Sequence, residues 1–246
     1  MQTNADSAML RILLAAFALC LGGEALARTG SIANLSGAVI AKGADGQSRI
    51  LSVKSEVREG DLLATSENSF VRVKFTDGTE MVLRPATQVK IEAYSFEEKN
   101  PGSDNIVMSL IKGGMRSVTG LLGKRNPDNF KLATPNATIG IRGTNFGAMF
   151  CANDCGKMQM PGGGAPPNGL HVDVADGAIS VTTNAGTADF KVGQFGYVSS
   201  PNTPPVAVPA SQGARVSLPP QAMSAPGPGS SGGGVGKAGG QECAVK

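Results

Sequence analysis

Short runs in which hydrophobic and polar residues alternate fill the chain between Ser36 and Ser199. In FVRVKF, residues 70–75, the valines and the second phenylalanine share one face, and the arginine and lysine share the other. QVKIEA, residues 88–93, alternates in the same way, whereas IVMSLI, residues 106–111, is apolar on both faces and is expected at the centre of a sheet. No window has an apolar stripe of helical period and length. The pattern predicts an all-β domain.

Two of the chain's Asp-Gly pairs separate long alternating runs. Asp77-Gly78 lies between the predicted strand 70–75 and EMVLR, and Asp176-Gly177 lies between LHVDVA and AISVTT. Asp-Gly between alternating runs is typical of a hairpin turn, which needs positive φ, so both pairs are predicted as hairpins. A unit of strand, loop, strand and turn recurs loosely three times along the chain. We therefore expect a single β-sandwich or wrapped β-roll of short antiparallel strands.

Composition sets the boundaries of this domain. Arg11, an apolar run over residues 12–23 and then Ala25-Leu26-Ala27 have the layout of a secretory signal peptide, with cleavage expected before Arg28. The apolar run is shorter than the ~20 residues that span a bilayer, so no membrane span is expected after cleavage. Residues 199–246 are rich in Pro, Gly, Ser and Ala and are predicted as a disordered tail. The sequence therefore divides into a signal peptide (1–27), a β-domain (28–198) and a tail (199–246).

Charge and cysteine content narrow the setting. The formal net charge is only +3, and the basic residues are dispersed along the chain, which is unlike the concentrated basic stripe of a nucleic-acid-binding protein. In an oxidising compartment Cys151 and Cys155 are predicted to form a local disulfide. The alternative is a metal site that adds Asp154 and His171, but a closed zinc site needs about four ligands and the chain has only one histidine. Cys243 is the unpaired cysteine, in the tail. We expect no metal site.

The stretch TPNATIGIRGT, residues 134–144, is the most distinctive part of the chain. It could form an anion cradle, in which backbone amides and a guanidinium hold a carboxylate or phosphate. It could instead be a strand whose glycines mark a bulge or close backbone packing. The candidate binding residues of this stretch and its continuation are Gly140, Arg142, Gly143, Thr144 and Asn145.

His171 and Asp173 share a strand face opposite Leu170 and Val172. As a base and an orienting acid they would need a nucleophile such as Ser180 or Thr182, and such a pair on a sheet is more often a solvated face. A hydrolase that uses His171 is therefore the least favoured function. Sugar binding usually relies on aromatic platforms, but the chain has no Trp and two Tyr, so its candidate platforms are Phe70 and Phe195.

Taken in order, several of these motifs resemble the FecR-domain family. The matching pieces are Gly37–Val39, Val57–Asp61, Asp77–Thr79, Gly113–Arg116, Thr134–Phe146 and Asp176–Ile179. The resemblance covers about Gly37 to Val198 and implies an extracytoplasmic β-domain, named after the ferric-citrate signalling regulator. That regulator also has a cytoplasmic anti-sigma segment and a transmembrane helix. Here only 11 residues precede the apolar run, so the chain is more similar to stand-alone secreted FecR-domain proteins.

The resemblance brings no catalytic residues, and the sequence indicates no cofactor. We expect a non-enzymatic interaction or sensory module, in the periplasm or at the surface of a Gram-negative-type bacterium, that binds an envelope protein or peptide in envelope signalling. An exposed sheet edge would provide the contact, because its unpaired backbone groups can accept an added strand. The alternative is a protein that binds the cell wall or another polysaccharide.

Overall fold

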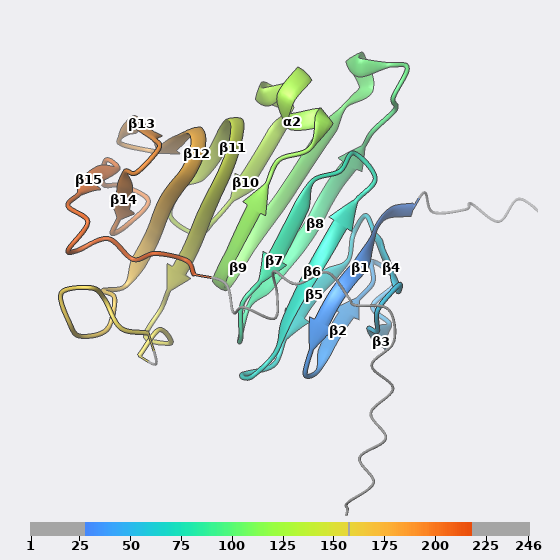
Figure 1. Ribbon diagram of the computed structural model, residues 1–246, viewed down its shortest axis with the longest axis horizontal. Helices are drawn as coiled ribbons and strands as arrows, with labels where there is room; N and C mark the ends of the chain where they lie inside the picture. Colours follow the sequence, from blue (N-terminus) through green and yellow to red (C-terminus); the bar gives the residue numbers. More distant parts are fainter. Residues whose placement is uncertain (1–27, 157, 218–246) are drawn as a thin grey trace, which may run out of the picture.

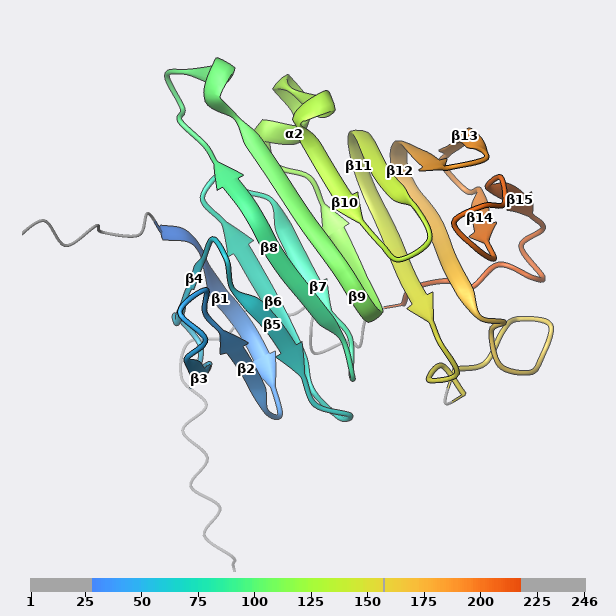
Figure 2. The same cartoon turned by 180° about the vertical axis from the view of Figure 1, so that it is seen from behind.

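A computed structural model describes residues 28–156 and 158–217, and strands make up most of the regular structure in this part of the chain (Figures 1 and 2). The predicted signal peptide, Cys243 and the tail from residue 218 onward lie outside the described residues. No described helix has the length and hydropathy needed to cross a membrane. The prediction of an all-β fold is confirmed.

The described residues contain fifteen strands and three short helical turns. The strands of the first half are β1 (Arg28–Ser36), β2 (Val39–Lys42), β3 (Ser48–Ile50), β4 (Glu56–Arg58), β5 (Leu62–Thr65), β6 (Phe70–Phe75), β7 (Glu80–Leu83) and β8 (Gln88–Ser95). The second half contains β9 (Asn105–Val118), β10 (Phe130–Ala133), β11 (Thr138–Cys151), β12 (Gly169–Thr183), β13 (Gly186–Lys191), β14 (Phe195–Val198) and β15 (Val206–Val208). The helical turns are η2 (Pro101–Ser103), α2 (Leu121–Arg125) and η3 (Pro127–Asn129).

All fifteen strands belong to one hydrogen-bonded network that divides into two layers. Layer 1 contains, in order, β4, β1, β6, β7 and the second half of β9, then the second half of β11, the first half of β12, β14 and β15. Layer 2 contains β3, β2, β5, β8 and the first half of β9, then β10, the first half of β11, the second half of β12, and β13. The pairings are antiparallel, apart from the parallel pair β9–β10.

One apolar core lies between the two layers. Val71, Val73 and Met81 from layer 1 belong to the same buried cluster as Val89 and Ile91 from layer 2. The cluster also includes residues near both ends of the molecule, from Ile32 in β1 to Phe190 in β13. In β6 and β8 the residues predicted to face inward at these positions are buried, so the alternating pattern identified the inner face of these strands correctly.

The three long strands β9, β11 and β12 pass from one layer to the other. Each bends at a glycine with positive φ, a conformation that L side chains rarely adopt: Gly113 (φ 80°), Gly143 (φ 57°) and Gly177 (φ 75°). The segments that flank β9 meet, since Asp104 just before the strand is ion-paired with Arg125 in α2 after it. Shared bent strands of this kind correspond to a wrapped β-roll.

The two Asp-Gly predictions have different outcomes. Asp77-Gly78 forms the predicted turn of the β6–β7 hairpin. The prediction of a second hairpin at Asp176-Gly177 is wrong, because β12 continues through this pair and both of its halves stay paired with β11. Gly177 lies so close to the bend of β11 that an added Cβ would come 2.1 Å from the carbonyl oxygen of Gly143. The two bends therefore pack against each other.

The predicted start of the tail at residue 199 is also wrong for its first part. β15 pairs with β14, and the chain then returns over layer 1 as a segment that we call the strap, residues 209–217. Ala214 and Val216 of the strap are buried. Two small apolar side chains in a Pro- and Gly-containing segment give no periodic signal, so composition alone placed the boundary too early.

Candidate interaction surface

The glycine–arginine stretch provides the bend of β11 in place of a closed cradle. Gly143 has positive φ, and the pairing of β11 with β12 shifts register between Arg142 and Asn145, which confirms the interpretation as a bulge. Thr144 is buried, and its backbone amide and carbonyl both bond to Thr119, with the amide donating to Thr119 Oγ1 over 2.8 Å. An added Cβ at Gly140 would meet nothing within 4 Å. Thr144 and Gly143 therefore have structural roles here.

The predicted site residues do not converge. Arg142 and Gly143 line an open depression of about 540 Å³ together with Lys124 and Asp128. Gly140 and Thr144 are absent from its lining, and Asn145 belongs to a different surface, where its Oδ1 accepts a hydrogen bond from Arg116. The depression thus brings together two basic side chains and one acidic side chain.

The outer face of layer 1 contacts the strap, and we call this surface the strap seat. Its side chains form two rows that run across four strands, in direct register. The first row is Arg116, Gly147, Asp173 and Phe195, and the second is Gly114, Met149, His171 and Tyr197. The strap crosses these strands and contacts the first row (Figure 1). Sequence reasoning placed His171 and Asp173 on one face correctly, but the expectation that this face is solvated is wrong.

Asp173 and Arg116 form a largely buried ion pair in the first row, with side chains that are 5% and 12% exposed. Arg116 also donates to Asn145 Oδ1 over 2.9 Å and to the carbonyl oxygen of Val216 over 3.0 Å. The second carboxylate oxygen of Asp173 accepts the amide of Val216 over 2.9 Å. The ion pair therefore holds both backbone groups of one strap residue.

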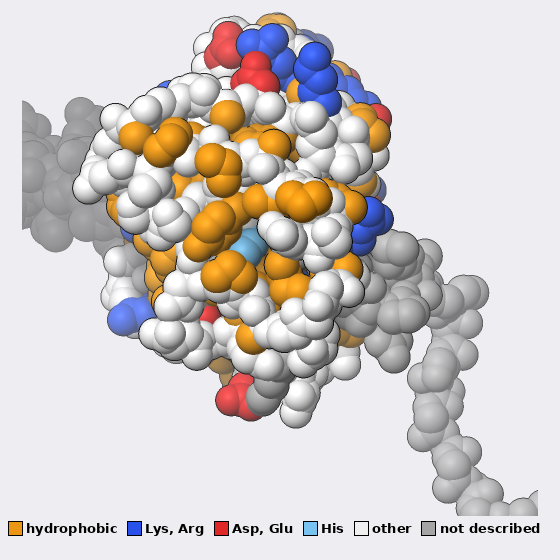
Figure 3. Space-filling model, turned by 90° about the vertical axis from the view of Figure 1, so that its left-hand side faces the viewer, with side chains coloured by type: hydrophobic (Ala, Val, Ile, Leu, Met, Phe, Trp, Pro, Cys, Tyr) orange, Lys and Arg blue, Asp and Glu red, His pale blue; other side chains and the backbone are white. Residues whose placement is uncertain are grey.

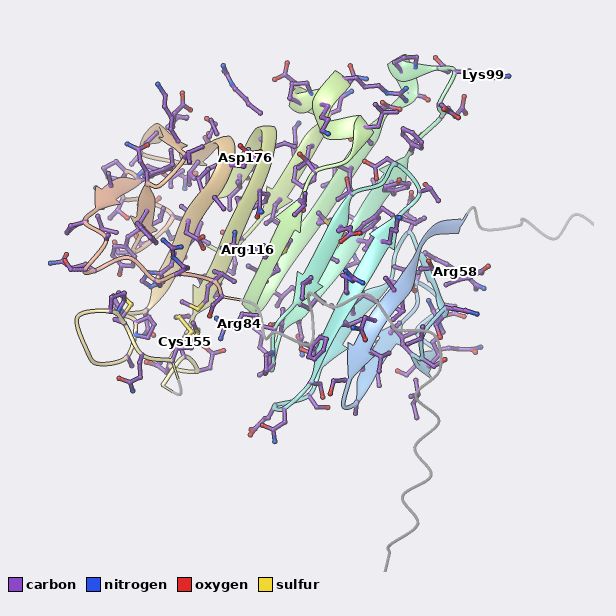
Figure 4. The ribbon with its side chains drawn as sticks, viewed as in Figure 1. Arg58, Arg84, Lys99, Arg116, Cys155 and Asp176 are labelled. Carbon is purple, nitrogen blue, oxygen red and sulfur yellow. A yellow bond between two sulfur atoms is a disulfide. The ribbon has the colours of Figure 1, made fainter. Side chains whose placement is uncertain are left out.

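An apolar cluster borders this ion pair. Cys151 and Cys155 form the predicted disulfide, which excludes a metal site at these two sulfurs. The buried members of the cluster are Met149, Cys151, Cys155, Ala214 and Val216, with Met158 and Met160 packed against them. Figure 4 shows Arg116, Arg84 and Cys155 in this region of the molecule. Among the described residues, no group of three His, Cys, Asp or Glu side chains is placed to hold a metal ion.

A cavity of about 520 Å³ adjoins the cluster and shares Met149, Cys155 and Met158 with it. Its lining also includes Arg84 and Lys112. Burial lowers the pKa of Arg84, and the Nη1 of this residue has no hydrogen-bond partner among the described residues. Glu67 and Asp154 line it too, so the cavity combines an apolar wall with charged side chains of both signs.

His171 lies at the floor of a second hollow, of about 380 Å³, at the β14–β15 end of the molecule (Figure 3). It is only 2% exposed, its ring packs on Tyr197, and its Nε2 lies 2.8 Å from the carbonyl oxygen of Pro167. Because that oxygen can only accept, Nε2 carries the proton, and burial lowers the pKa of the imidazole. Both carboxylate oxygens of Asp173 are bonded, one to Arg116 and one to Val216. Asp173 therefore does not orient His171, and the two residues do not form the base–acid pair considered from the sequence.

Comparison with known proteins gives a family match over part of the chain. Residues 61–180 match the family model described as FecR protein. Two crystal structures of candidate anti-sigma factors from Parabacteroides distasonis are 16% and 14% identical to the chain, with TM-scores of 0.45 and 0.43. Each alignment covers 60% of this chain, and the chain spans 58% of each of those proteins. TM-scores below 0.5 do not establish a shared fold.

A third solved structure, described as a cell surface anchoring domain, is 28% identical over 26% of this chain and 84% of its own length, with a TM-score of 0.26. No curated protein matches the chain at a significant level. The family match covers much of the predicted resemblance, including all of β9 and all of β11. Residues 61–180 therefore match the FecR family, and the predicted resemblance to this family is confirmed over that range.

Proposed function

We propose that the protein is a non-enzymatic, extracytoplasmic interaction module that binds an envelope protein or peptide in envelope signalling. The family match supports a regulatory role, and the predicted signal peptide supports a location in the periplasm or at the cell surface. Phe70 and Phe195, the candidate platforms for sugar binding, are buried, so the polysaccharide alternative loses its strongest residues.

The observation that carries this proposal is the free edge of β13. Among the described strands, β13 pairs with β12 alone. The amide of Lys191 donates to the side-chain Oε1 of Gln194, so this amide points away from β12. Backbone direction alternates along a strand, so the amides of Thr187 and Asp189 also point away from β12. These groups can accept a strand from a partner protein by β-augmentation.

Proline at position 189 tests this docking mode, because it removes one outward amide and leaves the ladder with β12 intact. The matched control is Asp189→Ala, which changes the same side chain but keeps the amide. Cross-linking of the exported protein in envelope fractions is expected to recover a partner with the wild type and with Asp189→Ala. Recovery with Asp189→Pro is expected to fall about tenfold, because the complex loses roughly one hydrogen bond and the neighbouring strand pairs fit less well.

Equal recovery with both variants would exclude the β13 edge as the docking surface. Sedimentation of the same proteins with purified peptidoglycan at low salt tests the polysaccharide alternative, and co-sedimentation that is unaffected by Asp189→Pro would favour that alternative. The mass of the exported protein tests the location, because cleavage before Arg28 removes residues 1–27.

A further inference from the structure

The strap is bound to the sheet in the way that a protein binds a peptide ligand. The backbone hydrogen bonds made by the strap's own amides are local: Gln212 to Pro209, Gly213 to Ala210, and Ser217 to Arg215. The bonds that join the strap backbone to the strap seat come from the Arg116–Asp173 pair, which binds the carbonyl and the amide of Val216. Side chains of the strap seat thus form hydrogen bonds with the strap's backbone at one residue, and these bonds take the place of a sheet ladder.

The strap seat fits small side chains at defined positions of the strap. An added Cβ at Gly147 would lie 2.3 Å from Asp173 Oδ2 and 2.6 Å from the Cβ of Val216, so the strap needs a glycine below it. An added Cβ at Gly213 would lie 2.3 Å from the ring of Phe195, so the strap itself needs glycine there. Ala214 and Val216 enter the apolar cluster beside the disulfide. Arg215 lies over the Phe195 ring, with its guanidinium carbon 5.5 Å from the ring centroid.

Contacts within the sheet also orient the central side chain of the strap seat. Arg116 bonds directly to Asp173 from β12 and to Asn145 from β11, so two neighbouring strands hold its guanidinium in position. The wall around Val216 also extends past the strap into the cavity of about 520 Å³ that shares Met149, Cys155 and Met158. The surface therefore has space for a ligand that is longer than the part of the strap it now holds.

We propose that the strap seat is a peptide-binding site that the chain's own strap occupies, and that an extended segment of a partner protein with the pattern Gly-Ala-x-Val competes for it. The pattern follows from the contacts: glycine against Phe195, a small residue and a valine in the apolar cluster, and a basic residue preferred between them over the Phe195 ring. This site is separate from the β13 edge, which belongs to the opposite layer.

Binding of a labelled peptide with the sequence of residues 209–217 tests the proposal on the full chain. In Val216→Asp a charge at a buried position releases the strap but leaves every residue of the strap seat unchanged. In Gly213→Val the clash with Phe195 releases the strap from its other end. Fluorescence anisotropy is expected to show that both variants bind the peptide at least about tenfold more tightly than the wild type, because the wild-type strap competes within the molecule.

Two altered peptides provide matched controls. N-methylation of the valine amide removes the hydrogen that Asp173 accepts, and replacement of the valine by aspartate removes the apolar contact. Each change is expected to weaken binding to the released variants by about tenfold to a hundredfold, because a hydrogen bond to a charged group is lost or a charge is buried. A purely structural strap predicts no binding of any of the three peptides.

Absence of binding to both released variants, when their circular dichroism matches the wild type, would overturn the proposal. Failure of both variants to fold would overturn it too, since the strap would then be a fixed part of the fold. Dimers that form through exchanged straps would assign the site to a second copy of the chain and overturn the partner assignment. Asp189→Pro is expected to leave peptide binding unchanged, so failure at the β13 edge and failure at the strap seat are distinguishable.

Discussion

At the scale of single residues, His171 shows what alternation along a strand can and cannot predict. Alternation correctly separates His171 and Asp173 from the core residues Leu170 and Val172. It cannot show that the strap and the loop around Pro167 cover the outer face, because those segments are distant in sequence or lack a periodic pattern. As a result the chain's only histidine is buried, with a proton held on Nε2 by Pro167.

The lowered pKa of His171 predicts how stability depends on pH. Below the unfolded-state pKa of about 6.5, the unfolded chain takes up a proton that the folded protein does not, because burial opposes the charged imidazole. The contribution of neutral His171 to the free energy of unfolding is therefore fully present above about pH 6.5, and it decreases as the pH falls towards the lower folded-state pKa. Urea unfolding between about pH 7.5 and 5.5 measures this slope.

His171→Gln is the control for this prediction, since glutamine can still donate to Pro167 but does not titrate. The free energy of unfolding of the variant is expected to vary less between these pH values than that of the wild type. An identical pH dependence in both proteins would show that His171 is not responsible for it.

At the scale of elements, identical dipeptides have different outcomes for a physical reason. Asp77-Gly78 ends one strand and begins its antiparallel partner, so the local hairpin signal is sufficient. At Asp176-Gly177 the neighbouring strand β11 bends at the same level, and Gly177 packs on Gly143. The strand therefore continues around a corner with its neighbour. The contact of Gly177 with Gly143 joins residues that are far apart in the sequence. The glycine–arginine stretch by itself therefore predicted a bulge, but it did not show that the strand bends there from one layer to the other.

Substitution of Gly177 tests the contact between the two bends. Gly177→Ala introduces both an unfavourable positive φ and a Cβ about 2.1 Å from the Gly143 oxygen. Gly193→Ala is the matched control, since Gly193 has φ 82° and open space where its Cβ would lie. The control is expected to lower the free energy of unfolding by about 1–2 kcal/mol from backbone strain alone.

Gly177→Ala is expected to lower the free energy of unfolding by a further ~1–3 kcal/mol, because the backbone of β11 must also move. Urea unfolding of the two variants measures the difference. Equal losses in both variants would mean that only the local conformation of Gly177 matters, and that the two bends do not depend on each other.

At the scale of the whole molecule, the sequence predicted the composition of the core better than the boundary of the domain. The alternating strands supplied most of the buried residues, but the strap adds Ala214 and Val216 outside that core, on the far side of layer 1. The predicted binding residues were separated for a similar reason. The bend of β11 lies between Arg142 and Asn145. The two residues are therefore in different layers and belong to different surfaces.

The single core predicts that the two ends of the molecule unfold together. Tyr94 in β8 and Tyr197 in β14 are the only tyrosines of the chain, which has no Trp, so each can report on its own end. In Tyr197→Phe the fluorescence of Tyr94 is expected to change at the same urea concentration as the far-UV circular dichroism, and Tyr94→Phe tests the other end likewise. Each comparison is made within one variant, since loss of the Tyr94 hydroxyl also removes its bonds to Thr76 and Asp77. Separate transitions in either variant would reveal two independent units.

The three strands that both layers share also affect how the chain reaches its native state. Half of β9 pairs with β8, the other half pairs with β7 and β11, and β11 and β12 are divided in the same way. Neither layer can be completed while the other is absent, and many of the pairs that must form join positions far apart in the sequence. Such a high contact order is associated with folding in the range of about milliseconds to seconds. The corners that close this roll therefore also set the pace at which it can assemble.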